Sequence, residues 1–220
     1  MKEALLKARL THEDADLVCD ACAITAQRAA EEGELSKGFT TEDAAAISMY
    51  TYEFGKENYE KIPYKFVNMS LVGRNYAELK RASGLLYLLL SALRKMPRYT
   101  GRTLYRGIQS KVDVKQYKEG NVIPWRGFSS TSPDMKLTKT LLKKGTEDGK
   151  ATGTLFIIEN GWGYNIQPYS LFPGEEEILL EPERQFKVTN VISSSDLTVI
   201  NLEMLDTPLL LPEVFGHGRE

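Results

Sequence analysis

The sequence predicts an α+β protein in which helices come first and strands follow. Residues 1–97 show apolar side chains at helical spacing, and the texture changes after Pro97 to short β-type runs separated by Gly, Pro, Asn and Ser. Many short strands with turn residues between them favour a two-sheet β-sandwich over β-α-β units. With 220 residues and 42% hydrophobic content, the chain is long enough for one sizeable core and a small second lobe.

The first half contains helix starts that can be read from local chemistry. Thr11 precedes two acidic residues in "THED", which is typical of an N-cap, and "FTTEDAAAISMYTYEF" begins a second helix in the same way. A shorter segment surrounds Phe66, and a strong helix is expected from Tyr76 to Met96 because Pro97 stops it.

The second half contains runs of β-forming residues and one helix, at about 134–144. The expected strands are "TLYRG", "NVIPWRGFSSTS", "GTLFIIE", "GYNIQPY", "EEEILLE", "FKVTNVI" and "LTVINLEML".

We expect the following domain organisation, with loose ends at residues 1–10 and 207–220. The parts are an N-terminal helical extension (1–40), a main domain (41–205) made of a helical lobe (41–97) and a β core (98–205), and a C-terminal tail (206–220).

Charge and hydropathy argue against two classes of partner. The net charge of -2 gives no broad electrostatic grip on nucleic acid or on an anionic membrane. The longest apolar run, "LLYLLLSAL" (85–93), is about half as long as a membrane span. The N-terminus lacks the apolar core of a secretion signal, so we expect a cytoplasmic protein, or one that is secreted and delivered without a classical signal peptide.

The two cysteines, Cys19 and Cys22, form "CDAC" within a helical stretch. A redox pair or half of a metal site is one interpretation, but no second pair follows, and His12 and His217 lie at opposite ends of the chain. We therefore expect two small packed thiols, no disulfide framework and no metal.

Three stretches carry candidate site residues, and the first is "TLYRG" (103–107). Arg106 can be an edge-strand arginine that reaches solvent, or a guanidinium that binds a phosphate with both of its prongs. The neighbouring Gly107 would leave a ligand room to approach.

The second stretch is "GFSSTSPD" (127–134), with consecutive hydroxyls in a β context. These side chains can simply pack and hydrogen-bond, and Pro133 with Asp134 can begin a helix.

The third stretch is "SLFPGEEEILLEPERQF" (170–186), in which three glutamates precede the apolar run 178–180. If the strand includes them, alternation places Glu175 and Glu177 on one face and Glu176 on the other. Adjacent like charges repel, so two acids on one face suggest a function, although a solvated acidic strand end is the alternative.

Taken in order, the three stretches resemble the arginine-serine-glutamate branch of the ADP-ribosyltransferases. "LYRG" resembles the arginine motif of that family, Ser130-Thr131-Ser132 its Ser-Thr-Ser motif, and Glu175-x-Glu177 its Glu-x-Glu motif. Together with "AAAISMYTYEF" and "KFVNMSLVG", which look like the family's helical lead-in, the resemblance covers roughly residues 40–192. It implies an ADP-ribosyltransferase fold, with the β core as the NAD-binding part.

The resemblance also implies the chemistry. NAD+ is then a substrate, cleaved between nicotinamide and ribose through a cation-like sugar that Glu177 stabilises. Ser130 would orient Glu177, and Arg106 would clamp the diphosphate of NAD+. Glu175 would position the acceptor guanidinium, and a Glu at this place goes with arginine as the acceptor.

Further contacts follow from the same resemblance. Gly107, Thr131, Ser132 and Trp162 would also contact NAD+, with Trp162 stacking on nicotinamide or simply packing in the core. Phe172 lies where family members carry an aromatic on the loop that recognises the acceptor; the alternative is a phenylalanine that packs against a turn.

The partners expected are NAD+ and a protein bearing an acceptor arginine, bound by a monomer. Three alternatives stay open: an NAD+ glycohydrolase with the same site, a silent binding module of the same fold, and an unrelated β-sandwich. The sequence does not assign a role to residues 1–40.

Overall fold

The chain forms two compact units. The structure, a computed structural model, describes residues 1–54, 62–143 and 150–207. The helical unit comprises Met1–Tyr99 and Gly163–Leu179, and the strand unit comprises Thr100–Trp162 and the chain from Leu180 onward. The chain passes from one unit to the other within strands β4 (Gly153–Asn165) and β5 (Ile178–Leu180). The predicted domain boundaries stay a prediction.

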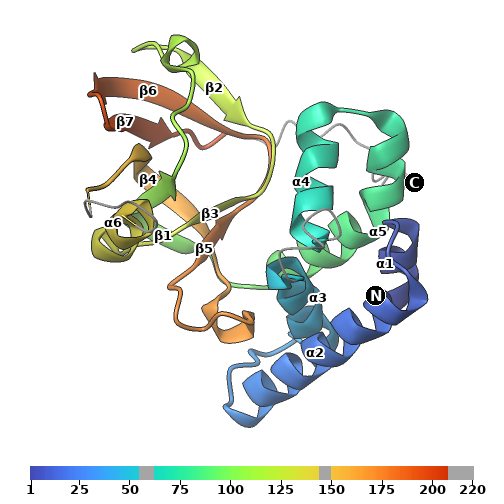
Figure 1. The fold of residues 1–220 in the computed structure, drawn as a ribbon. Helices are drawn as coiled ribbons and strands as arrows, with labels where there is room; N and C mark the ends of the chain where they lie inside the picture. The colour runs from blue at the N-terminus through green and yellow to red at the C-terminus, as the bar shows by residue number, and fades with distance from the viewer. Residues whose placement is uncertain (55–61, 144–149, 208–220) are drawn as a thin grey trace, which may run out of the picture. The chain divides into compact units, whose positions relative to one another are not determined.

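The helical unit is built around two contacting helices, α3 and α5. In Figure 1, α2 packs along α3, while α1, α3 and α4 pack against α5. Its elements are α1 (Lys2–Lys7), α2 (His12–Glu31), α3 (Thr41–Thr51), α4 (Pro63–Gly73), α5 (Tyr76–Leu93) and the 3-10 turn η3 (Gln167–Tyr169).

Local capping explains where these helices begin, as the sequence indicates. The Thr11 side chain accepts a hydrogen bond from the backbone of Asp14 at 3.1 Å, at the start of α2. At the start of α3, Thr40 and Asp43 form a reciprocal capping box. The long helix α5 begins as predicted but ends at Leu93, before the expected Met96.

The prediction that residues 1–10 are loose is wrong. They contain α1, whose Leu5 is fully buried, and α1 packs on α5. A Cβ at Gly84 of α5 would lie 2.9 Å from the Cβ of Ala4, so this glycine permits the close approach of the two helices. Such a short helix depends on tertiary packing rather than on propensity, which the local sequence does not reveal. The other end expected to be loose, residues 207–220, lies outside the described residues except for Thr207.

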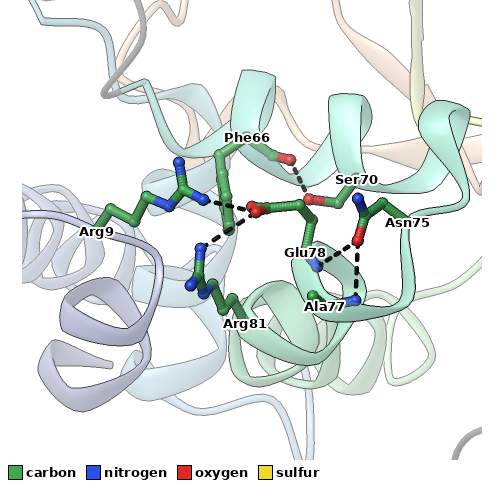
Figure 2. A network of polar contacts seen from close by, with 7 residues as sticks. All are labelled: Arg9, Phe66, Ser70, Asn75, Ala77, Glu78 and Arg81. Carbon is green, nitrogen blue, oxygen red and sulfur yellow. Dashed lines mark hydrogen bonds and ion pairs between the residues drawn. The ribbon is translucent and has the colours of Figure 1, made fainter.

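A polar network ties the loop after α1 to the start of α5 (Figure 2). Glu78 accepts hydrogen bonds from Arg9 at 2.6 Å and from Arg81 at 3.1 Å. Asn75 accepts from the backbone of Ala77 and Glu78, which caps α5. Arg9 and Arg81 are largely exposed, so this network contributes modestly to stability.

In the part of the chain that the structure describes, the strand unit contains most of the strands and one α-helix. Its elements are β1 (Tyr99–Ile108), η2 (Val114–Gln116), β2 (Val122–Trp125), β3 (Ser129–Thr131), α6 (Met135–Lys143), β6 (Arg184–Ser193) and β7 (Leu197–Met204), with most of β4.

The strands follow one hydrogen-bonded order, β2-β6-β7-β4-β5-β3, and β1 also pairs with β4 (Figure 1). β7 runs parallel to β4 and antiparallel to β6. The α+β class is confirmed. The long strand β4 pairs with β7 and also with β5. "GYNIQPY" is not a separate strand, because β4 continues through Asn165 and the segment then turns into η3.

Within the described ranges, every helix falls short of the combined length and apolar character that a membrane crossing demands.

Candidate active site

Arg106 lies on β1 and is held by contacts with two other segments of the strand unit. Its Nη1 donates a hydrogen bond to the backbone oxygen of Ser130 at 2.7 Å. Its Cζ lies 5.9 Å from the centre of the Trp125 ring. Trp125 itself packs on Phe156 and Phe186, at ring distances of 5.0 and 4.5 Å. The guanidinium is therefore positioned at the edge of an aromatic cluster while remaining partly exposed.

The positive charge of Arg106 affects the pKa of a neighbouring tyrosine, Tyr117. Burial raises the pKa of Tyr117, while the Trp125 hydrogen bond and the positive charge of Arg106 act in the opposite direction. An anion that reached Arg106 would meet a fixed positive charge beside an apolar surface, where electrostatic attraction is stronger than in bulk water.

The hydroxyl motif lies on β3 and just after it. Ser130 is exposed, whereas Thr131 is buried, as expected for side chains that alternate across a strand. The backbone of Ser132 exchanges two hydrogen bonds of 2.8 Å with Tyr105, and its hydroxyl accepts from the backbone of Asp134 at 3.1 Å. Ser132 thus has a structural role ahead of α6.

Gly107 is required by packing against α6. A Cβ at this position would lie 3.1 Å from side-chain atoms of both Thr138 and Leu142, and 3.3 Å from the backbone oxygen of Thr138. The sequence suggested that this glycine leaves room for a ligand. The structure gives the space beside it to a helix, and a contact of its backbone with NAD+ stays a prediction.

The glutamates do not lie on a strand, which corrects the expectation that Glu175 and Glu177 share a strand face. β5 begins only at Ile178, and the glutamates form the end of the preceding turn. Glu175 donates its backbone N–H to Phe172 at 3.0 Å and accepts one from Glu177 at 2.7 Å. Because the backbone turns here, Glu175 and Glu176 are exposed, while Glu177 is only 7% exposed.

Tyr64, at the start of α4, is a neighbour of Glu177 that the sequence did not single out. Burial, the charge of Glu53 and a 3.4 Å hydrogen bond to Glu53 raise the pKa of Tyr64 to about 12, and the charge of Glu177 adds to the shift. Tyr64 therefore stays a neutral hydroxyl near the buried carboxylate. The one sequence feature that could have pointed to Tyr64 is its position directly after Pro63, in the first turn of a helix.

Phe172 lies at the exposed tip of the segment between η3 and β5. Its side chain is 42% exposed, and its backbone N–H donates to the Ser170 hydroxyl at 3.0 Å. The Gln167 side chain donates to the backbone oxygen of Pro173 at 3.0 Å. An aromatic side chain held outward in this way has the exposure that recognition of a partner requires, although its predicted role is not tested by this geometry.

Trp162 is buried on β4 and packs against a charged side chain. The Cζ of Arg184 lies 3.7 Å from its ring centre, and Arg184 also forms a buried ion pair with Glu181. The Arg184 guanidinium occupies a place over the indole. This contact supports the core-packing interpretation of Trp162, and stacking on nicotinamide stays a prediction.

The cysteines are free thiols. Burial is the main cause that raises the pKa of Cys22 to about 12, which disfavours the thiolate that redox chemistry and metal binding require. Across the ranges that the structure describes, His, Cys, Asp and Glu side chains form no group of three that could hold a metal ion.

The candidate residues thus fall into two sets, each with its own geometry. In the strand unit, Arg106 binds the backbone of Ser130 directly. In the helical unit, Glu175 and Glu177 are joined through their backbones and differ in exposure. The first set offers a positive charge and hydroxyls, and the second a buried acid, an exposed acid and an exposed aromatic.

Comparison with known proteins identifies relatives of this chain. The family model of the NAD:arginine ADP-ribosyltransferases matches residues 3–207. The protein Vis of Vibrio splendidus is 31% identical over 116 residues, which are 51% of this chain and 46% of Vis. The erythroblast NAD(P)(+)–arginine ADP-ribosyltransferase of Gallus gallus is 25% identical over 173 residues, which are 77% of this chain and 54% of the relative. The chain spans about half the length of these curated relatives.

Solved structures confirm the predicted fold. ADP-ribosyltransferase Vis in complex with agmatine matches with a TM-score of 0.59 and 22% identity, over 86% of this chain and 85% of Vis. The type III effector XopAI from Xanthomonas axonopodis pv. citri, in a 70-residue N-terminal truncation, matches with a TM-score of 0.67 and 19% identity, over 93% of this chain and 85% of the truncated chain.

Proposed function

Because the chain belongs to the NAD:arginine ADP-ribosyltransferase family, we propose that it transfers ADP-ribose from NAD+ to arginine side chains of a protein and releases nicotinamide. The observation that carries the proposal is the contrast between two acids two residues apart. Glu177 is 7% exposed and Glu175 is exposed. A buried carboxylate suits the sugar cation, and an exposed one suits an acceptor that arrives from outside.

Arg106 binds the diphosphate of NAD+ in this proposal. Its Nη1 donates to the backbone oxygen of Ser130, and a guanidinium presents its donors in one plane, a geometry that suits the oxygens of a phosphate. The contact with Trp125 limits the side-chain freedom that phosphate binding would otherwise have to remove. Gly107, Thr131, Ser132 and Trp162 complete the proposed NAD+ contacts.

Glu177 stabilises the ribose as its bond to nicotinamide breaks. Both electrons of that bond go to the nicotinamide nitrogen, which becomes neutral, and positive charge develops on the sugar. A carboxylate that is already desolvated and fixed stabilises this charge more strongly than water does. Ser130 is proposed to orient Glu177, and Tyr64, whose pKa is raised, is a neutral hydroxyl in the neighbourhood of that carboxylate.

Glu175 acts on the acceptor. The incoming guanidinium is protonated and nucleophilic only after it loses a proton, which Glu175 accepts as the new bond from nitrogen to the sugar forms. Phe172 lies beside it on the acceptor loop, defined as residues 167–176, and packs against the target. Agmatine, which carries a guanidinium group, is the molecule bound in the Vis complex and supports this choice of acceptor.

The proposal also covers the setting of the activity. XopAI is a type III effector, which supports a protein that is secreted and delivered. In the proposal the protein is cytoplasmic or delivered, and it acts as a monomer on a protein target bearing an acceptor arginine. The proposal includes no bound metal, nucleic acid or membrane.

The test is incubation with labelled NAD+ and agmatine, with release of nicotinamide and of free ADP-ribose measured separately. We compare the wild type with Glu175→Gln, and use Glu176→Gln as the matched control because Glu176 is the exposed neighbour. Wild type and control should form ADP-ribosyl-agmatine. Glu175→Gln should lose that product by about a hundredfold and keep hydrolysis.

Two results would contradict the proposal. Equal hydrolysis by wild type and Glu175→Gln without any agmatine product would assign the chain as an NAD+ glycohydrolase. No consumption of NAD+ by the wild type would identify a binding module of the same fold.

A further inference from the structure

The acceptor loop has a firmly held base and an exposed tip. At its base, η3 packs against both α2 and α3 in the helical unit, and Tyr169 and Ser170 are buried. At its tip, Phe172 and Glu175 are exposed. The position of the tip is therefore set by whatever holds the base.

Helix α3 holds the base through two hydroxyls that face it. Ser48, fully buried, donates to the backbone oxygen of Tyr169 at 2.6 Å. Thr51 accepts the backbone N–H of Leu171 at 3.1 Å and donates to the oxygen of Ser48 at 2.9 Å. These bonds fix the backbone on both sides of Ser170.

Helix α2 and the segment that follows it hold the base from a second direction. Nη2 of Arg28, in the last turn of α2, donates to the backbone oxygens of Pro168 and Ser170, each at 3.3 Å. The Tyr169 hydroxyl donates to the backbone oxygen of Glu34 at 2.9 Å, and its ring lies 4.8 Å from that of Phe39. One guanidinium thus spans two carbonyls of the loop.

The tip is closed mainly by short-range bonds. Its backbone bonds run from Phe172 to the Ser170 hydroxyl and from Glu175 to the Phe172 oxygen, and Gln167 reaches Pro173. Because these bonds lie within the acceptor loop, they shape the tip but do not place it. The ends of the loop are joined by the pairing of β4 with β5 and by the Ile166 N–H, which donates to the Glu177 oxygen at 3.1 Å. Between these ends, α2 and α3 place the loop.

We propose that the N-terminal region is a brace for the acceptor loop, and that Arg28 is a positioning residue for the transfer of ADP-ribose to arginine. This inference rests on the proposed function. It gives the N-terminal helices a role in acceptor use: α2 holds the loop that carries Phe172 and Glu175, and it does so through the carbonyls of Pro168 and Ser170.

The consequence is a separation between the two reactions of the site. Transfer to a guanidinium requires Glu175 within proton-transfer reach of the acceptor, and a shift of about 1 Å can cost about a hundredfold in rate. Hydrolysis requires only that water reach the sugar cation, which the acceptor loop does not have to position. Weakening the brace should lower transfer and leave hydrolysis.

The experiment compares Arg28→Ala, Arg28→Lys and Tyr169→Phe, which removes only the hydroxyl that bonds Glu34. Arg81→Ala is the matched control, because Arg81 bonds Glu78 in the same unit but does not touch the acceptor loop (Figure 2). Agmatine transfer and NAD+ hydrolysis are measured for each variant. We expect the ratio of transfer to hydrolysis to fall about tenfold in Arg28→Ala, with a higher KM for agmatine, and to recover partly in Arg28→Lys.

A readout independent of activity separates the two proposals. Hydrogen–deuterium exchange of the amides at 169–172 and 174–176 should be faster in Arg28→Ala and Tyr169→Phe than in the wild type and Arg81→Ala. Unchanged exchange, an unchanged ratio, or an equal loss of transfer and hydrolysis would each overturn the brace. A wild type that consumes no NAD+ would overturn the proposed function instead, and the exchange result would still report whether α2 holds the loop.

Discussion

In the strand unit, Arg106 and Ser130 lie on strands and meet through a backbone oxygen, whereas in the helical unit Glu175 and Glu177 lie on a turn that side chains of α2 and α3 hold in place. Backbone pairing along strands leaves little freedom for adjustment. By contrast, each hydrogen bond from a helix side chain to the loop can be lost or replaced on its own when that side chain is substituted.

This difference assigns two tasks to two kinds of structure. NAD+ is the invariant substrate of the proposed reaction, and Arg106, proposed to bind its diphosphate, lies on a strand. The acceptor is a protein surface, and the residues proposed to contact it lie on the acceptor loop, which side chains of α2 and α3 hold in place. Substitutions that affect NAD+ binding should therefore leave acceptor recognition unchanged, and substitutions in the acceptor loop should leave NAD+ binding unchanged.

The largest effect is expected at the buried acid. Glu177→Gln should lower nicotinamide release, with or without an acceptor, by about a hundredfold or more, because the neutral amide cannot stabilise the sugar cation. Chromatographic measurement of nicotinamide checks it, with Glu176→Gln as the exposed neighbour that should behave like the wild type. Retained cleavage in Glu177→Gln would remove the contrast between buried and exposed acids as the basis of the proposal.

A smaller effect is expected at Arg106, the residue on β1 that is proposed to bind the diphosphate of NAD+. Arg106→Lys should raise the KM for NAD+ about tenfold, because an ammonium cannot bind Ser130 and a phosphate with the planar geometry of a guanidinium. The ratio of transfer to hydrolysis should not change. Arg126→Lys, at an exposed position on the connection between β2 and β3, is the control. An altered ratio of transfer to hydrolysis in Arg106→Lys would mean that NAD+ binding and acceptor recognition depend on each other.

Stability, rather than activity, tests how tightly the strand unit is packed around Arg106. Gly107→Ala should lower the free energy of unfolding by about 1–3 kcal/mol, because the new methyl group would press on Thr138 and Leu142 of α6. Urea unfolding measures the change. Gly73→Ala is the control, since a Cβ there meets nothing within 4 Å. Equal stability of Gly107→Ala and wild type would show that α6 yields easily.

The smallest effect is expected at the cap of α3, the helix that carries Ser48 and Thr51. Partial burial of Asp43 opposes ionisation, but hydrogen bonds from Lys95 and Thr40 outweigh it and lower the pKa of Asp43 below its ordinary value. A depressed pKa stabilises the fold above the unfolded-state pKa, and this stabilisation is lost as the pH falls through the folded-state pKa.

Asp43→Asn should therefore cost about 1 kcal/mol in the free energy of unfolding at pH 7, and the difference from wild type should shrink at about pH 3. Urea unfolding at both pH values measures it. The exposed Asp20→Asn should change little at either pH. A difference that is the same at both values would show that the ion pair with Lys95 does not contribute.

Much of the fold was predictable because its determinants are local. Thr11 and Thr40 cap helices through atoms three residues away, and Pro97 and the β-branched runs change the texture of the chain. The candidate residues Arg106, Ser130, Glu175 and Glu177 were likewise identified from short motifs. The separate strand expected at "GYNIQPY" was wrong, because the boundary of β4 depends on pairing with β5 rather than on local residues.

The sequence by itself determined the class of the fold, the helix starts and the identity of the candidate residues. Tertiary structure decided which of the two acids is buried, brought Tyr64 near Glu177 and placed Arg28 on the carbonyls of the acceptor loop. The physical reason is that burial and electrostatic coupling depend on segments that are distant along the chain. Arg28 and Pro168 are separated by most of the protein in sequence, and only packing of η3 on α2 makes them neighbours.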